Sequence, residues 1–294
     1  YLKIAEGCDR LCSFCAIPSI RGKYVSKPIE QVMAEAEELA ADGARELILV
    51  AQDTSSYGRD LYGRPRLARL LGRLEGVRGL EWIRLMYLYP RDLGDELIEV
   101  LASGRKVLPY LDLPLQHAGD RVLRRMNRRT SGGHTERLID RLRQRIEGLV
   151  LRTTLIAGFP GETEEDFRAT LRAFEELEFD QAFMFKYNDR PGTRAAEMEP
   201  KVPEEEKQRR LEELVALENE IAREKNRRLV GASFEVLVEE PDLRSPGHVR
   251  GRTRTNKLMI FPGAEDLIGE MVTVRARQAY LWGFKGVPAP LGAA

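Results

Sequence analysis

The sequence is poor in metal-binding residues and has no excess of either charge. It contains only 3 cysteines and 3 histidines in 294 residues. Zinc sites usually take four such ligands at paired spacings, and an odd cysteine is left over after any disulfide, so both arrangements are disfavoured. The 47 basic residues balance the 47 acidic ones. Any nucleic-acid surface must therefore be local.

Long apolar runs are also missing. No stretch approaches the roughly 20 residues that span a bilayer, and no signal peptide is visible. We therefore expect no membrane partner. Because free cysteines persist in a reducing compartment, we expect a cytoplasmic protein. The chain starts at Tyr1, directly in a predicted strand, and we expect it to be part of a longer protein.

All three cysteines fall within one eight-residue stretch. Cys8, Cys12 and Cys15 have a C-x3-C-x2-C spacing, with Phe14 just before the last cysteine. Three thiolates can bind three corners of a cubic iron–sulfur cluster. Such clusters are normally closed by four cysteines, so an open fourth corner favours chemistry over electron storage. The spacing therefore predicts a catalytic 4Fe–4S cluster held by these residues.

Strands and helices alternate over most of the chain. Apolar strands are predicted at 1–5, 46–51, 82–86, 110–113, 151–157 and 182–187, with helices at 28–43, 95–102, 120–126, 135–146 and 163–177. Thr163 and Asp166 predict a capping box at the start of the last helix. The alternation of strands and helices indicates a parallel sheet with crossover helices. Six strands are too few for an eight-stranded barrel, so we expect an α/β fold, an open (β/α)6 partial TIM barrel. Reactive groups should collect at the C-terminal ends of its strands, where Gln52-Asp53, Gln116-His117 and Gly158–Glu162 lie.

A long charged helix and a small second domain follow. Pro203 begins a helix that is predicted to reach about Val230. Beyond it, apolar residues recur with period two between glycines and prolines, which predicts a small antiparallel β-barrel. The predicted domains are therefore 1–230 and 231–294. The basic stretch Arg250–Lys257 either binds RNA phosphates or forms an ordinary polar hairpin.

Several segments carry a family resemblance. They are YLKIAEGCDRLCSFC, PSIRGKYVSKP, AQDTSSYG, YLDLPLQHA and GFPGETEEDF, with a C-terminal domain similar to TRAM modules. Together they resemble the methylthiotransferase branch of radical S-adenosylmethionine (SAM) enzymes. The resemblance is strongest to enzymes that add a methylthio group to the β-carbon of an aspartate in small-subunit ribosomal protein twelve. YNDRPGT and GRTRTNK are more similar to the branch that modifies isopentenyl-adenosine of tRNA, and that substrate is the alternative.

The resemblance implies two cofactors, a 4Fe–4S cluster and SAM, and an electron donor such as flavodoxin or ferredoxin. It also implies the site residues: Cys8, Cys12 and Cys15 as cluster ligands, Phe14 near adenine, Gln52 and Asp53 at the methionine amino group, Gln116 and Arg152 at ribose or carboxylate, and Thr154, Ile156 and Gly158 as the adenine cradle. Simpler roles stay open for three of them. Gln116 could bond a loop backbone, Arg152 could be exposed at a strand start, and Gly158 could serve only a turn.

The resemblance further implies an N-terminal domain with three more cysteines, which bind a second 4Fe–4S cluster involved in sulfur delivery. The cysteines of this sequence are all used by the motif described above. We therefore expect that this chain alone cannot complete a methylthiolation. Two other hypotheses remain: a non-catalytic RNA-binding protein with a structural metal loop, and a radical SAM enzyme of different outcome, such as a simple methylase.

Overall fold

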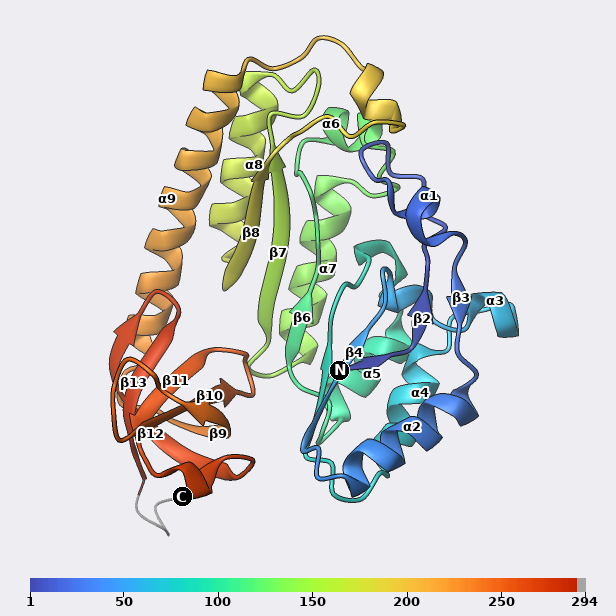
Figure 1. Cartoon of the computed structure of the whole chain (residues 1–294). Helices are drawn as coiled ribbons and strands as arrows, with labels where there is room; N and C mark the ends of the chain where they lie inside the picture. The colour runs from blue at the N-terminus through green and yellow to red at the C-terminus, as the bar shows by residue number, and fades with distance from the viewer. Residues whose placement is uncertain (290–294) are drawn as a thin grey trace.

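The computed structural model describes residues 1–289, and its first domain is built on six parallel strands. These are β1 (Leu2–Lys3), β4 (Glu46–Val50), β5 (Trp82–Leu85), β6 (Tyr110–Asp112), β7 (Val150–Ala157) and β8 (Gln181–Lys186). The strands β1, β4 and β5 pair in parallel, as do β6, β7 and β8. A parallel bridge between Ile83 and Val107 connects the two halves. Within residues 1–289 no pairing joins β8 back to β1, so the barrel is open, as predicted (Figure 1).

The helices between the strands pack their apolar faces against the sheet. The longer ones are α2 (Ile29–Ala41), α4 (Leu67–Leu74), α5 (Asp95–Ser103), α7 (Gly132–Arg145) and α8 (Glu164–Leu177). The capping box predicted from Thr163 and Asp166 is present at the start of α8. Helix α4 has no counterpart among the predicted elements, although its buried leucines recur at helical spacing. Shorter helices are α1 (Ile17–Arg21), α3 (Arg59–Tyr62) and α6 (Asp120–Arg125).

The first predicted strand is divided in two. It continues beyond β1 as β2 (Ala5–Glu6), which pairs antiparallel with β3 (Val25–Ser26). The chain then turns at Gly7, whose φ is +78°. A Cβ at Gly7 would lie 2.1 Å from the carbonyl oxygen of Lys23, so only glycine fits here. The cysteine loop is therefore carried by a two-stranded ribbon and not by the parallel sheet itself.

A long helix leads to the second domain. α9 (Glu204–Arg228) passes beside β8 and ends at the small barrel (Figure 1). Five strands close this barrel in the order β10-β11-β13-β12-β9, and all pairings except β11–β13 are antiparallel. The strands are β9 (Ser233–Pro241), β10 (His248–Thr253), β11 (Leu258–Pro262), β12 (Met271–Tyr280) and β13 (Gly283–Pro288). The predicted small barrel is confirmed, and residues 290–294 of the predicted domain lie outside the described residues.

The barrel docks on the end of the core that lies opposite the cysteine loop (Figure 1). Arg84 of β5 is 2% exposed and pairs with Glu46 at 2.5 Å. Its guanidinium also donates to the carbonyl oxygens of Arg254 at 3.0 Å and Thr253 at 3.3 Å. Arg254 in turn donates to the Arg105 carbonyl at 3.1 Å. Part of the predicted phosphate-binding stretch is therefore used in the contact between the domains.

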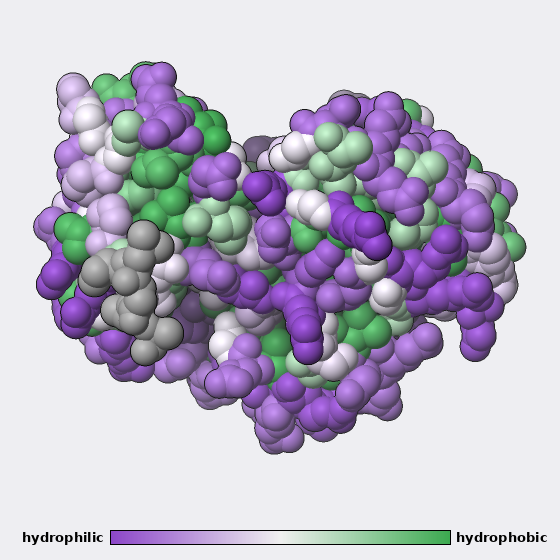
Figure 2. All heavy atoms as spheres, turned by 90° about the horizontal axis from the view of Figure 1, so that it is seen from below, coloured by the Kyte–Doolittle hydropathy of each residue, from purple (hydrophilic) through white to green (hydrophobic). Residues whose placement is uncertain are grey.

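This end of the molecule is strongly hydrophilic. Figure 2 shows mostly hydrophilic side chains on both lobes and a hollow between them. Among residues 1–289, no helix is both long enough and apolar enough to cross a membrane.

Candidate active site

A cavity of about 440 Å³ lies at the C-terminal ends of the core strands. Its lining contains all three cysteines and five of the eight residues predicted to contact SAM: Phe14, Gln52, Asp53, Gln116 and Thr154. Gln52 and Asp53 follow β4, Gln116 follows β6 and Thr154 lies in β7. Segments far apart in the sequence therefore meet where parallel α/β barrels place their reactive groups.

The three cysteines are free thiols, and each sulfur has a hydrogen-bond donor nearby. The donors are Arg10 N–H at 3.4 Å from Cys8 Sγ, Ile17 N–H at 3.5 Å from Cys15 Sγ, and Arg128 Nη1 at 3.9 Å from Cys12 Sγ. Among residues 1–289, no three His, Cys, Asp or Glu side chains could together hold a metal ion. A cubic cluster does not require such convergence, because each thiolate binds a different iron. The donor set therefore fits a cluster better than a single ion.

Burial keeps the thiols of Cys8 and Cys15 protonated when no metal is bound, because it raises the pKa of each. Burial raises the pKa of Cys8 to about 11, and the neighbouring Asp53 and the other two cysteines raise it as well. The pKa of Cys15 is also raised, again mainly by burial. Because metals bind thiolates, cluster assembly must displace these protons.

Gln52 presents an acceptor that no group of residues 1–289 uses. Its Nε2 donates to Glu6 Oε1 at 3.3 Å. Its Oε1 is buried and has no hydrogen-bond partner within residues 1–289. Buried acceptors without a partner are rare and costly. An amino group of a ligand in the cavity would satisfy this oxygen, which is the contact expected from the family resemblance.

Asp53 is already engaged by other side chains. The residue is 4% exposed. Its Oδ2 accepts from Arg10 Nε at 2.7 Å and from Ser56 Oγ at 2.8 Å, and its Oδ1 accepts from Ser55 Oγ at 2.6 Å. Arg10 also pairs with Asp92. The Asp53 carboxylate therefore fixes the arginine of the cysteine motif in place.

A second cavity of about 260 Å³ adjoins the first and shares Phe14, Cys15, Gln116 and Thr154 with it. Ile156, another predicted adenine contact, lines this second cavity. Gln116 has a φ of +73°, which is uncommon for a side-chain-bearing residue. Its N–H donates to the Thr154 carbonyl at 2.7 Å, and its carbonyl accepts from Ile156 N–H at 2.8 Å. These bonds to β7 hold the strained residue at the cavity wall.

Two predicted residues lie outside both linings. Arg152 is 7% exposed and donates to both carboxylate oxygens of Asp112, at 2.7 and 3.1 Å. It is therefore not the exposed strand-start residue of the simpler interpretation. Gly158 has a φ of +76°, and a Cβ there would lie 2.3 Å from Lys207 Cγ. Its N–H donates to Glu162 Oε2 at 2.8 Å, so Gly158 is part of a tight turn.

Eight lining residues were not predicted from the sequence, and they include Arg10, Tyr89, Arg128 and Arg190. The guanidinium groups of Arg10 and Arg128 lie 3.9 and 4.3 Å from the centroid of the Tyr89 ring. Arg10 stands inside the cysteine motif, and its position there was an available signal. Arg190 stands in the YNDRPGT segment quoted in the sequence analysis, whereas Tyr89 and Arg128 come from two other loops.

The same two-part organisation appears in comparisons with known proteins. Residues 2–174 match the Radical SAM superfamily, and residues 227–286 match the TRAM domain. The chain belongs to the radical SAM superfamily. This result confirms the resemblance to radical SAM enzymes that the cysteine motif and the other quoted segments carry.

Individual relatives cover most of this chain. A protein of Pelotomaculum thermopropionicum named ribosomal protein uS12 methylthiotransferase RimO is 52% identical, over 86% of this chain and 57% of the relative. A protein of the same name from Desulforamulus reducens is 44% identical, over 97% and 66%. A tRNA-2-methylthio-N(6)-dimethylallyladenosine synthase from Carboxydothermus hydrogenoformans is 42% identical, over 98% and 65%. The chain thus spans between 57% and 66% of the length of these relatives.

Solved structures share the fold at low sequence identity. The methyltransferase TsrM from Kitasatospora setae, with cobalamin and a [4Fe–4S] cluster bound, aligns with a TM-score of 0.55 and 22% identity, over 66% of this chain and 38% of that one. Coproporphyrinogen III oxidase (HemN) from Escherichia coli aligns with a TM-score of 0.54 and 20% identity, over 74% and 51%. At this identity the two structures support the fold alone.

Proposed function

We propose that this chain is the catalytic core of a radical SAM methylthiotransferase that modifies the β-carbon of an aspartate in small-subunit ribosomal protein twelve. The observation that carries the proposal is the cavity in which three free thiols meet the unused acceptor of Gln52. The choice of substrate is supported by relatives named RimO at 52% and 44% identity.

The cofactors of the proposed reaction are a 4Fe–4S cluster and SAM. Cys8, Cys12 and Cys15 would hold the cluster, and Gln52 Oε1 would accept a hydrogen bond from the amino group of SAM. When bound, these cofactors supply hydrogen abstraction from an unactivated carbon, which no side-chain base can perform. The chain's own contribution is to orient the groups and to exclude water.

Five of the remaining predicted residues fall into two groups in this proposal. Phe14, Thr154 and Ile156 form the wall against which the adenine lies. Asp53 and Arg152 act indirectly, because each is held in an ion pair with another residue. A small donor such as flavodoxin or ferredoxin would supply the electron, and the reaction would take place in the cytoplasm. The TRAM-like barrel, which we begin at residue 231, would contact RNA near the substrate.

A tRNA adenosine is the second candidate substrate, and one observation favours it. Arg190 lies in the YNDRPGT segment, is exposed and lines both cavities. No ion pair within residues 1–289 includes it. A guanidinium at the rim of the cavity suits a phosphate. A relative that is 42% identical carries the name of a tRNA-modifying synthase.

The test offers the two substrates separately. The chain, extended by the N-terminal domain that the resemblance implies, is reconstituted with iron and sulfide and given ribosomal protein twelve or isopentenylated tRNA in anaerobic reactions. A methylthio mass gain on the protein aspartate is the expected result. A mass gain confined to the tRNA would overturn the proposal in favour of the second candidate.

The chain without that extension provides a further test. With a reductant it should cleave SAM to 5′-deoxyadenosine slowly and should methylthiolate neither substrate. A methylthio product formed by residues 1–294 alone would show that no second cluster is needed.

A further inference from the structure

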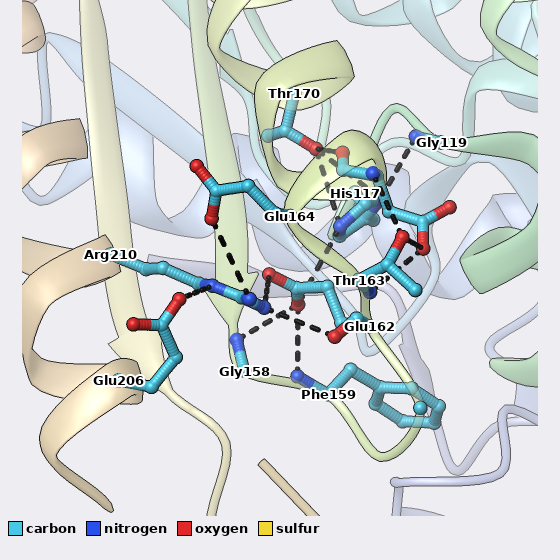
Figure 3. A network of polar contacts seen from close by, with 12 residues as sticks. His117, Gly119, Gly158, Phe159, Glu162, Thr163, Glu164, Thr170, Glu206 and Arg210 are labelled. Carbon is cyan, nitrogen blue, oxygen red and sulfur yellow. Dashed lines mark hydrogen bonds and ion pairs between the residues drawn. The ribbon is translucent and has the colours of Figure 1, made fainter. Parts of the chain in front are cut away.

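A buried carboxylate lies behind the cavity and has no part in the function proposed above. The side chain of Glu162 is completely buried and follows the turn Gly158–Gly161. Its Oε2 accepts from the N–H groups of Gly158 at 2.8 Å and Phe159 at 2.9 Å. Its Oε1 accepts from Arg210 Nη1 at 2.9 Å (Figure 3). One carboxylate therefore holds the turn that follows β7 and connects it to α9.

The partners of Glu162 are themselves fixed. Arg210 is 4% exposed, and its Nε donates to Glu206 Oε1 at 2.7 Å. His117 lies on the other side, with Nε2 3.6 Å from Glu162 Oε2. Because His117 Nδ1 accepts from Gly119 N–H at 2.8 Å, the neutral imidazole carries its proton on Nε2, toward Glu162. The network therefore joins the loop after β6, the turn after β7 and helix α9.

The turn at 158–161 also fixes the position of a side chain in the cavity wall. The Phe159 ring is completely buried and packs edge-to-face against Phe14, with 6.5 Å between centroids and an interplanar angle of 83°. Tyr187 packs against the same ring at 5.2 Å. Phe14 stands between Cys12 and Cys15 and lines both cavities. The backbone position of Phe159 therefore sets the position of the aromatic side chain between two cysteines.

Helix α9 anchors the network from outside. Its fully buried side chains are Arg210, Leu214, Ala222 and Asn226. Asn226 Nδ2 donates to the carbonyl oxygens of Tyr280 at 2.8 Å and Leu281 at 3.2 Å in the TRAM-like barrel. At about 1.5 Å per residue, the two polar anchors lie about 24 Å apart along one rigid helix. The helix that carries the second domain is thus tied to the wall of the cavity.

We propose that Glu162, held by Arg210, is a positioning residue for SAM. It touches neither cofactor nor substrate. By fixing the Phe159 backbone, Glu162 sets the position of the Phe14 side chain, which is part of the cavity wall against which the adenine of SAM would lie. This inference rests on the proposed function, because SAM is the ligand that the wall receives.

The experiment compares two buried arginine pairs. Arg210→Met removes one partner of Glu162, and Arg84→Met removes the equally buried partner of Glu46 at the other end of the core. SAM dissociation constants are measured by equilibrium dialysis on reconstituted proteins with equal iron content. Amide hydrogen exchange of a peptide covering residues 158–162 is measured on the same proteins without cofactors. Arg210→Lys replaces Arg210→Met if the latter does not fold.

We expect Arg210→Met to weaken SAM binding about tenfold, as outer-shell changes commonly do, and to speed exchange at residues 158–162. Arg84→Met should lower stability without either effect. Unchanged SAM affinity and exchange in Arg210→Met would overturn the inference. Equal changes in Arg84→Met would also overturn it, because they would reflect general destabilisation. If the unmutated protein binds no SAM, the proposed function fails, and the exchange measurement still decides whether Arg210 orders the turn.

Discussion

The two ends of the parallel sheet contain similar polar groups but leave them in different states. At the end that faces the TRAM-like barrel, the guanidinium of Arg84 donates to Glu46 and to two backbone carbonyls of the loop at 253–254. Each donor nitrogen of this guanidinium is therefore paired with an acceptor of the protein itself. This end therefore has the character of a permanent contact between domains.

The cavity end leaves groups unused. Gln52 Oε1 and Arg128 Nε are buried without partners in the described part of the chain, and the three thiols are free. Tyr87 and Gln116, both lining the cavity, have positive φ values of 58° and 73°. Unsatisfied polar groups and backbone strain cost stability. Because the unpartnered atoms of Gln52 and Arg128 share one cavity with the three free thiols, this end is suited to bind a ligand, whereas the polar groups of Arg84 serve the contact between the domains.

The largest expected effect is loss of the cluster when a cysteine at the cavity end is replaced. In Cys12→Ala, iron and sulfide reconstitution should fail, because two thiolates cannot replace three. The unmutated chain should bind about one 4Fe–4S cluster, brown in colour and with an EPR signal that changes on adding SAM. Iron content and EPR spectra check this. Arg254→Ala, a change at the opposite end, is the control and should retain full iron content.

A colourless unmutated protein with stoichiometric zinc would contradict this prediction. It would favour the structural-metal hypothesis and would remove the functional difference between the two ends.

The opposite result is expected at the end that faces the barrel. Arg84→Met leaves Glu46 buried without its partner, and breaking such a pair typically costs about 3–5 kcal/mol. Urea unfolding should show this loss. Iron bound per folded chain should stay unchanged. A fall in iron content of the folded variant would mean that the two ends are coupled more tightly than the contacts indicate.

Gln52→Leu should have two smaller effects of opposite sign, one on stability and one on SAM affinity. The change removes an unsatisfied buried acceptor, so the chain without cofactors should be slightly more stable, by about 0.5–1 kcal/mol. The same change should weaken SAM binding by roughly ten- to a hundredfold, since a hydrogen bond to a charged amino group contributes about 1.5–3 kcal/mol. Urea unfolding and equilibrium dialysis measure the two quantities. Reduced stability together with unchanged SAM affinity would show that Gln52 serves the fold.

The sequence predicted what depends on neighbouring residues. The strand order, the capping box of α8 and the cysteine spacing are local patterns, and the structure contains the predicted strands and cap. The stack of Arg10 and Arg128 on Tyr89 could not be predicted, because it joins three loops that only the folded chain brings together.

The basic stretch at the end that faces the barrel is a second feature that neighbouring residues alone could not predict. From the sequence alone, Arg250–Lys257 is a candidate for phosphate contact. In the structure Arg250 pairs with Glu240, Arg254 lies 3.5 Å from Glu235, and Lys257 is 4% exposed. These partners are separated from the stretch in sequence and meet it through barrel pairing and domain docking. Local charge density therefore overstated how many cations are available to RNA.

The smallest expected effect is the contribution of Lys257 to the pH dependence of stability, and it tests whether this lysine is buried or available to RNA. Burial lowers the pKa of Lys257 below its ordinary value, with the nearby Lys225 acting in the same direction and Asp180 against it. Between the lowered pKa and about 10.4, the unfolded chain still binds the proton that the folded chain has released. Since stability rises with pH wherever the unfolded state binds more protons, Lys257 should make the protein more stable as the pH rises through that window. Below the window its buried charge is a constant cost.

Lys257→Met should therefore lose this alkaline rise and should be no less stable at neutral pH. Urea unfolding at a series of pH values, expressed as the difference between variant and unmutated protein, isolates the contribution of this one side chain. Lys285→Met, at a half-buried position of β13, is the matched control and should keep the rise. If Lys257→Met keeps the rise and instead weakens salt-dependent RNA binding, the lysine is accessible. The end that faces the barrel would then be a ligand surface as well.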